Sequence, residues 1–208
     1  MNSQFKYFKN IFLNNFHCND LPKCFSPVCS DLKIIEEIFN FCCNDTKKSK
    51  NRNQPVSIFC PKNEKVSRLF SIPNINSYSY LCFYISELLV NENLNKFLKN
   101  PSSYSLKWIN SILNDNQSFT FTNSYLKFKE DCFYNSEHYL YKMTLDISNF
   151  FNSIYSHSLS WVFYGREMSY QYSKDPNKPG EFNILNNIDK LLMNSNDKKS
   201  NGILIGPL

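Results

Sequence analysis

The stretch that decides the fold is Leu145-Asp146-Ile147-Ser148-Asn149-Phe150-Phe151. It follows residues 139–144, a run rich in strand-forming side chains, and Ser148 and Asn149 are residue types that cap helix N-termini. The pattern predicts a strand over 139–145, a single carboxylate, Asp146, at the strand end, and a helix that begins at Phe150. Such an arrangement fixes one anionic oxygen ligand at the rim of a sheet.

Upstream of this stretch, hydrophobic residues at helical spacing predict two amphipathic helices. They are Phe5, Phe8, Ile11, Phe12 and Phe16 in the first helix, and Leu32, Ile35, Ile38, Phe39 and Cys42 in the second. Residues 44–54 are polar and basic, and either a solvated connector or a phosphate-contacting loop fits them. Residues 56–60 and 66–74 are two strand-like runs around a Pro/Asn turn, which predicts a β-hairpin.

Further elements follow the hairpin. Helical periodicity predicts helices over about 77–98, 106–113, 161–168 and 182–193, while residues 119–122 favour a short strand. The polar stretches 169–180 and 194–201 are typical of loops.

The charge of the chain is uneven. Residues 1–68 carry 11 basic and 6 acidic side chains, the remainder balances, and the net charge is +5. A basic N-terminal region favours a polyanionic partner such as nucleic acid. No stretch reaches the roughly 18 apolar residues of a membrane helix, and the N-terminus lacks the apolar core of a secretory signal. We therefore expect a cytoplasmic protein without a membrane partner, whose eight cysteines are thiols rather than disulfides or zinc ligands.

Three motifs in this chain resemble those of reverse transcriptases, which are RNA-directed DNA polymerases. Residues 146–158, Asp-Ile-Ser-x-Phe-Phe-x-Ser-Ile-Tyr-x-His-Ser, resemble the first catalytic motif and look most like the bacterial abortive-infection and retron-like phage-defence branch. Residues 68–74, Arg-x-x-Ser-Ile-Pro-Asn, resemble the fingers motif. Residues 202–207 resemble the segment Gly-x-Pro-x-Gly-Pro, with Leu204 in place of the usual proline. Each motif alone is weak, and their order along residues 55–208 carries the resemblance.

The resemblance implies an α/β (α+β) fold made of the fingers and an incomplete palm of a right-hand polymerase, with N-terminal helices. Residues 1–54 would form the N-terminal helical region and basic loop, and residues 55–208 the reverse transcriptase-like domain. The reaction it implies is nucleotidyl transfer to DNA, RNA-directed or untemplated, within an anti-phage defence element. Its partners would be DNA or RNA together with deoxynucleotides.

The resemblance also assigns roles to individual residues. Asp146 would bind Mg²⁺, the carbonyl of Ile147 would assist, and Phe151 would stack beneath the sugar and exclude a 2′-hydroxyl group. Arg68 would contact the triphosphate, where a planar guanidinium can bind two oxygens at once. Lys65 would be a weaker second triphosphate ligand. Ile205 and Gly206 would lie against the template and the nascent base pair.

Members of this family carry two more metal-binding carboxylates in a Tyr/Phe-x-Asp-Asp hairpin after the Gly-Pro segment. No Asp-Asp pair occurs in these 208 residues. We therefore expect a chain truncated before that hairpin and inactive by itself, with a second polypeptide supplying the rest of the palm or that part lost. Self-association into a homo-oligomer through apolar residues near 203–208 stays open, as does a non-catalytic nucleic-acid-binding or assembly module that retains the fold.

Overall fold

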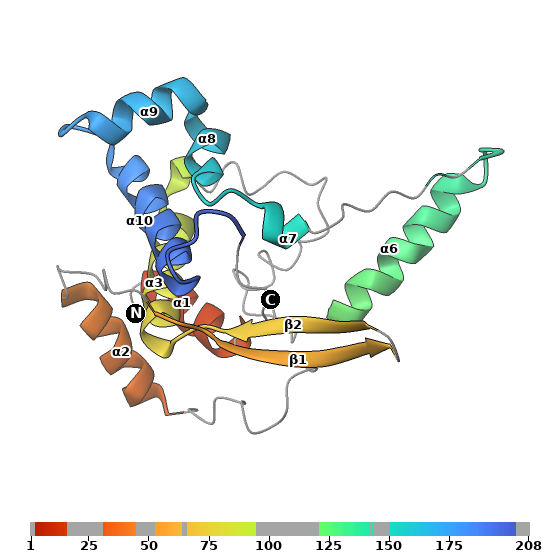
Figure 1. The fold of residues 1–208 in the computed structure, drawn as a ribbon, viewed down its shortest axis with the longest axis horizontal. Helices are drawn as coiled ribbons and strands as arrows, with labels where there is room; N and C mark the ends of the chain where they lie inside the picture. The colour runs from red at the N-terminus through yellow and green to blue at the C-terminus, as the bar shows by residue number, and fades with distance from the viewer. Residues whose placement is uncertain are drawn as a thin grey trace. The chain divides into compact units, whose positions relative to one another are not determined.

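Figure 1 shows the computed structural model of the chain. The structure describes residues 3–15, 31–44, 53–63, 66–94, 121–141, 143 and 150–202. The chain divides into two compact units, the first combining Met1–Asn95 with Asn149–Leu208 and the second comprising Lys96–Ser148. The described residues form eight named helices and one two-stranded antiparallel sheet, which confirms the predicted α+β class.

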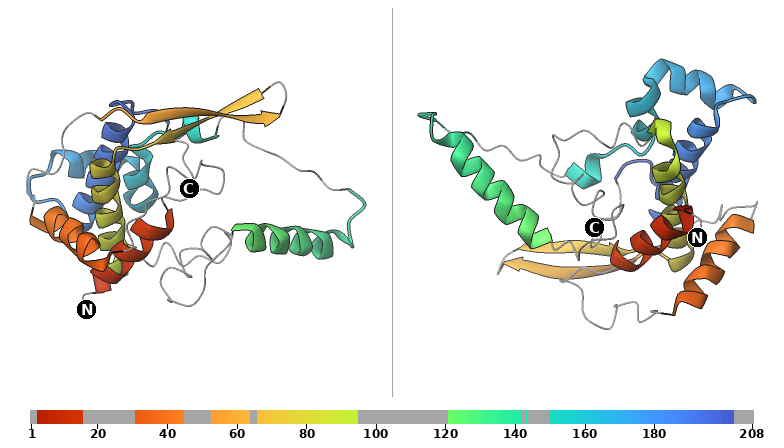
Figure 2. Two further views of the ribbon diagram at one scale, coloured as in Figure 1. Left: turned by 90° about the horizontal axis from the view of Figure 1, so that it is seen from below. Right: turned by 180° about the vertical axis from the view of Figure 1, so that it is seen from behind.

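Helix α3 (Ile75–Val90) is the centre of the first unit, and it contacts α1, α2 and α10. In Figure 2, α3 (yellow-green) lies among these three helices. Because neighbours cover it on several sides, its apolar and small polar residues are buried together: Ser77, Tyr78, Ser79, Tyr80, Cys82, Tyr84, Ser86, Leu88 and Leu89. The helix begins after Asn74, whose side chain accepts a hydrogen bond from the N–H of Asn76 at 3.0 Å.

The end of α3 differs from the prediction of a helix to about residue 98. Asn91 takes an extended conformation, with φ −71° and ψ 114°. Its side-chain oxygen accepts hydrogen bonds from the N–H groups of Asn93 and Leu94, both at 3.1 Å. This side chain starts a new turn and ends the helix at Val90, because an Asn oxygen competes with the backbone carbonyls for those donors.

The two predicted N-terminal helices are confirmed as α1 (Ser3–Asn15) and α2 (Leu32–Asn44). The following residues of their apolar stripes are buried: Phe5, Phe8, Ile11 and Phe12 on α1, and Ile35, Phe39 and Cys42 on α2. The ring of Phe39 lies 5.3 Å from the rings of both Phe5 and Phe8. Burial of each such ring contributes about 1.5–3 kcal/mol. The Tyr78 hydroxyl lies within hydrogen-bonding distance of the Ile11 and Phe12 carbonyls, so α1 is tied to α3.

The predicted β-hairpin is also confirmed. Strand β1 (Val56–Asn63) pairs antiparallel with β2 (Val66–Ile72), in a register that sets Val56 opposite Ile72, with an irregularity between Pro61 and Asn63. Just before β1, the backbone N–H of Asn53 donates to the Asn194 carbonyl at 3.1 Å, and its side chain donates to the Ser77 hydroxyl at 2.6 Å. These bonds fix the base of the hairpin beside α3 and the end of α10.

The C-terminal part of the first unit is helical. It contains α7 (Phe150–Ser153), α8 (Ser158–Tyr164), α9 (Arg166–Lys174) and α10 (Gly180–Ser195). The predicted helix start at Phe150 is confirmed, as is α10, whose Leu185 is fully buried. The predicted continuous helix over 161–168 is wrong because Gly165, at φ 77°, breaks it, and the predicted loop at 169–180 is wrong because α9 extends to Lys174.

In the second unit, the structure describes α6 (Phe121–Ser136) and a few residues after it. The predicted strand at 119–122 is wrong where it is described, since Phe121 and Thr122 begin α6. The predicted strand over 139–145 is likewise absent at its described residues: Tyr139, Leu140, Tyr141 and Met143. Their side chains are 74–94 % exposed. Strand-forming residues need a neighbouring strand to pair with, and composition does not supply one. No helix within the described ranges is long and apolar enough to cross a membrane.

Candidate functional site

Most of the sequence-predicted site residues lie outside the described residues. They are Lys65, Asp146, Ile147, Ile205 and Gly206. For Arg68 and Phe151 the structure describes the backbone only. Arg68 is in β2 opposite Cys60, and Phe151 is the second residue of α7. The described segments that carry or adjoin these residues define the geometry around the site.

The segment after α7 pairs with the segment after α10. The N–H of Gly202 donates to the Ile154 carbonyl at 2.7 Å, and the N–H of Ser156 donates to the Ser200 carbonyl at 2.9 Å. Tyr155 and Asn201 form an antiparallel β-bridge between these two bonds. The structure thus joins two of the three sequence motifs, which are more than 40 residues apart along the chain.

Gly202 allows this pairing to be close. Its φ is +86°, and a Cβ atom on it would lie 3.2 Å from the Asn152 carbonyl oxygen and 3.3 Å from the Asn152 Cα. The side-chain amide of Asn196 donates to the Gly202 carbonyl at 3.0 Å, so the turn after α10 also holds this residue. The resemblance implies that the segment 202–207 lies against a template. The atoms that approach Gly202 in the structure belong to the protein backbone.

A histidine–carboxylate pair lies next to this junction. Nδ1 of His157 is 2.5 Å from Oδ2 of Asp189 on α10. The side chain of Asp189 is 8 % exposed and that of His157 is 41 % exposed. The pair fixes the imidazole ring, because a carboxylate at Nδ1 holds the proton on that nitrogen. It also ties the loop between α7 and α8 to the buried face of α10.

In the sequence, His157 belongs to the motif at residues 146–158 but has no predicted role, and Asp189 is not predicted as a site residue. A signal was present in α10: Asp189 follows Leu185 by four residues and lies on the apolar stripe with Ile188, where a carboxylate is rarely buried unless paired. The second carboxylate oxygen, Oδ1, is buried and has no hydrogen-bond partner among the described residues.

Four side chains next to the junction form a contact series, which we call the 155–166 cluster: His157, Tyr155, Trp161 and Arg166. The Tyr155 ring lies 5.0 Å from the His157 ring in an edge arrangement and 5.4 Å from the Trp161 ring. The Arg166 guanidinium lies 5.5 Å from the centroid of Trp161. Tyr155 and Arg166 are exposed, and Trp161 is half-buried. Two aromatic rings thus lie between two basic groups in this series.

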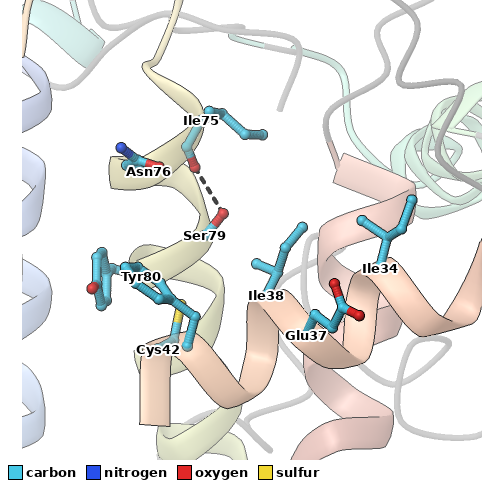
Figure 3. Close-up of a pocket in the computed structure, with 9 residues that line it drawn as sticks. Ile34, Glu37, Ile38, Cys42, Ile75, Asn76, Ser79 and Tyr80 are labelled. Carbon is cyan, nitrogen blue, oxygen red and sulfur yellow. Dashed lines mark hydrogen bonds between the residues drawn. The ribbon is translucent and has the colours of Figure 1, made fainter. Parts of the chain in front are cut away.

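A separate pocket of about 450 Å³ lies between α2 and α3 (Figure 3). Its walls are mainly apolar, with Ile34, Ile38, Phe41 and Tyr80 among the lining residues and Glu37 as the carboxylate. The Ser79 hydroxyl donates to the Ile75 carbonyl of its own helix at 2.8 Å. No set of polar groups converges on this pocket, so we assign it no chemistry.

Within the described ranges, no three or more His, Cys, Asp and Glu residues gather as a metal site. The side chains of four of the eight cysteines are described, Cys42, Cys43, Cys82 and Cys132, and none of these four is in a disulfide. Comparison of the sequence with models of protein families gives no match, and comparison with curated proteins gives none either.

Proposed function

We propose that this chain is part of a reverse transcriptase-like nucleotidyltransferase that makes DNA, RNA-directed or untemplated, in a bacterial anti-phage defence element. The three motifs at residues 68–74, 146–158 and 202–207, in the order that the family has them, are the origin of the proposal. The observation that carries it is the pairing of 154–156 with 200–202. A catalytic-motif segment and a template-segment glycine that belong to one site must be neighbours, and these two are.

The hairpin supports the same proposal. Its base is bonded through Asn53 to Asn194, a few residues before the turn that leads to Gly202. The hairpin that carries Arg68 is therefore anchored to the same end of α10 as the Gly202 segment. A bidentate guanidinium on a paired strand suits a triphosphate, because little side-chain and backbone freedom is lost on binding.

In this proposal Asp146 is a ligand for Mg²⁺, a hard cation that prefers oxygen donors, and the Ile147 carbonyl is a second oxygen donor. The bound ion would supply charge neutralisation at the triphosphate. Phe151 lies beneath the sugar, Lys65 and Arg68 contact the phosphates, and Ile205 and Gly206 lie against the base pair. Of the three carboxylates that bind metal in this family, Asp146 is the one that these 208 residues match.

The test is equilibrium binding of a fluorescent deoxynucleoside triphosphate to the 208-residue chain, with and without Mg²⁺, followed by anisotropy. We expect Mg²⁺-dependent binding that Asp146→Ala removes. Arg68→Ala should weaken it about 10-fold to 100-fold, the effect of losing hydrogen bonds to a charged group. Asp175→Ala is the matched control, because the Asp175 carboxylate caps only the N–H of Asn177 at the end of α9.

Native-like nucleotide binding by a folded Asp146→Ala variant contradicts the proposal. The alternative is a non-catalytic nucleic-acid-binding or assembly module that retains the fold. That alternative predicts binding of nucleic acid with no Mg²⁺-dependent binding of nucleotide. The same titration, repeated with an oligonucleotide, separates the two.

A further inference from the structure

We propose that the 155–166 cluster is a binding surface for single-stranded nucleic acid. Unpaired bases stack on Tyr155 and Trp161, while Arg166 and His157 contact the phosphates on either side. The proposal deepens the proposed function and rests on it for the role of the strand as template or primer. The binding itself requires only the geometry of these four side chains.

The four side chains of the cluster form one continuous series of contacts. The order of contacts is His157, Tyr155, Trp161 and Arg166, with 5.0 Å and 5.4 Å between neighbouring rings and 5.5 Å from Trp161 to the guanidinium. Proteins that bind single strands combine aromatic rings, on which bases stack, with cations that follow the backbone. Duplex bases have both faces covered, so rings that act by stacking select unpaired nucleotides.

The cluster is preformed because the buried Asp189 carboxylate fixes the His157 ring. This carboxylate holds Nδ1 of His157, and in the protonated imidazolium the other ring nitrogen, Nε2, is a donor for a phosphate oxygen. The His157 ring in turn meets Tyr155 edge-on at 71°, which restricts the orientation of the tyrosine ring. Rings that are already fixed lose little conformational entropy when a base stacks on them.

Simple core packing does not account for the cluster. Core aromatic residues in this chain, such as Phe8 and Tyr84, are 0–2 % exposed, whereas Tyr155 is 38 % exposed. The His157 side chain is 41 % exposed. An exposed arginine over a half-buried indole also suits single-stranded nucleic acid, because the guanidinium binds a phosphate while it stays over the ring.

The experiment measures binding of fluorescent oligo(dT), oligo(U) and a duplex of the same length to the 208-residue chain at several salt concentrations. Tyr155→Leu should weaken single-strand binding about 5-fold to 100-fold at every salt concentration, the range found for loss of one stacked base. Arg166→Gln should lower the slope of log affinity against log salt by about 0.7, the value for one lost phosphate contact on a single strand.

Conservative variants separate binding from folding. Tyr155→Phe keeps a stacking face and Arg166→Lys keeps the charge, so both should bind nearly as the native chain does. Tyr170→Leu is the matched control, an exposed tyrosine on α9 that pairs with Lys174 and lies outside the cluster. Circular dichroism of each variant confirms that it is folded.

Unchanged affinity of folded Tyr155→Leu together with an unchanged salt slope of Arg166→Gln overturns the proposal, as does equal affinity for duplex and single strand. Preference for oligo(U) or oligo(dT) assigns the strand to RNA or DNA. A different result would contradict the proposed function. In that result Asp146→Ala leaves nucleotide affinity unchanged, while the cluster variants still bind oligonucleotide more weakly. If nucleotide binding depends on Mg²⁺ as proposed but the cluster variants bind oligonucleotide normally, only the present inference is overturned.

Discussion

Replacing Gly202 with alanine is expected to break the pairing between 154–156 and 200–202. The new Cβ would meet two backbone atoms of Asn152, at 3.2 Å and 3.3 Å, and backbone atoms cannot rotate away as a side chain can. A φ of +86° is in addition unfavourable for alanine. Strain of this kind costs about 1–3 kcal/mol of folding free energy. With a urea m-value of roughly 2 kcal/mol/M, the unfolding midpoint falls by about 0.5–1.5 M.

Two other glycines are controls for this prediction. Gly165 has φ +77° with no atom within 4 Å of a Cβ position, so Gly165→Ala measures backbone strain without a contact. Gly180 begins α10 without a positive φ and has open space around it, so Gly180→Ala should stabilise the chain by about 0.4–1 kcal/mol. The three variants therefore separate conformational strain, close contact and helix propensity.

The assay is urea unfolding followed by circular dichroism, with amide hydrogen exchange at Ser156 and Gly202. These two amides donate the hydrogen bonds of the junction, so their exchange should accelerate in Gly202→Ala and stay slow in Gly165→Ala. A Gly202→Ala variant with native stability and native protection at both amides would refute the reasoning. The junction would then not be held by close backbone contact.

Three further predictions concern other sites. Phe151→Ala should raise the affinity for ribonucleotides relative to deoxynucleotides in the anisotropy assay. If the ratio of the two affinities is unaltered, Phe151 does not contact the sugar. Asp189→Ala should destabilise the chain by about 1–3 kcal/mol, because a charged hydrogen bond to His157 is lost, and a double-mutant cycle with His157→Ala should show coupling rather than additivity. Burial raises the pKa of the Cys82 thiol well above its ordinary value, so the contribution of this thiol to stability is complete below about pH 9 and falls as the pH rises above it. Cys82→Ala should reduce that fall, which pH-dependent urea unfolding measures.

Local patterns predicted much of the fold. The spacing of Phe5, Phe8 and Phe12 predicted α1, and the spacing of Phe182, Leu185 and Ile188 predicted α10, since a helix that buries one face repeats that face in its sequence. The hairpin followed from two strand-like runs and a Pro/Asn turn. In each of these cases the information lies within a dozen residues.

Other features depend on contacts between distant segments. Helix α9 is mostly polar, so no apolar stripe marks it, although its Ser169 is buried. Tyr139, Leu140, Tyr141 and Met143 favour a strand but do not form one, because pairing requires a partner that composition does not provide. The His157–Asp189 pair joins residues 32 positions apart and exists only because α8 contacts α10. Periodicity places Asp189 on a helix face but cannot name the residue opposite it.

The contact between α3 and α10 has a consequence for how the protein is made. The two helices are neighbours in the first unit, yet α3 ends at Val90 and α10 begins at Gly180. A ribosome adds about 5–20 residues per second, so α3 waits roughly 5 to 20 s for its partner. During that time the face of α3 that α10 will cover is open to water and to other nascent chains. The central helix of the first unit therefore stays partly uncovered until the last helix of that unit has been made.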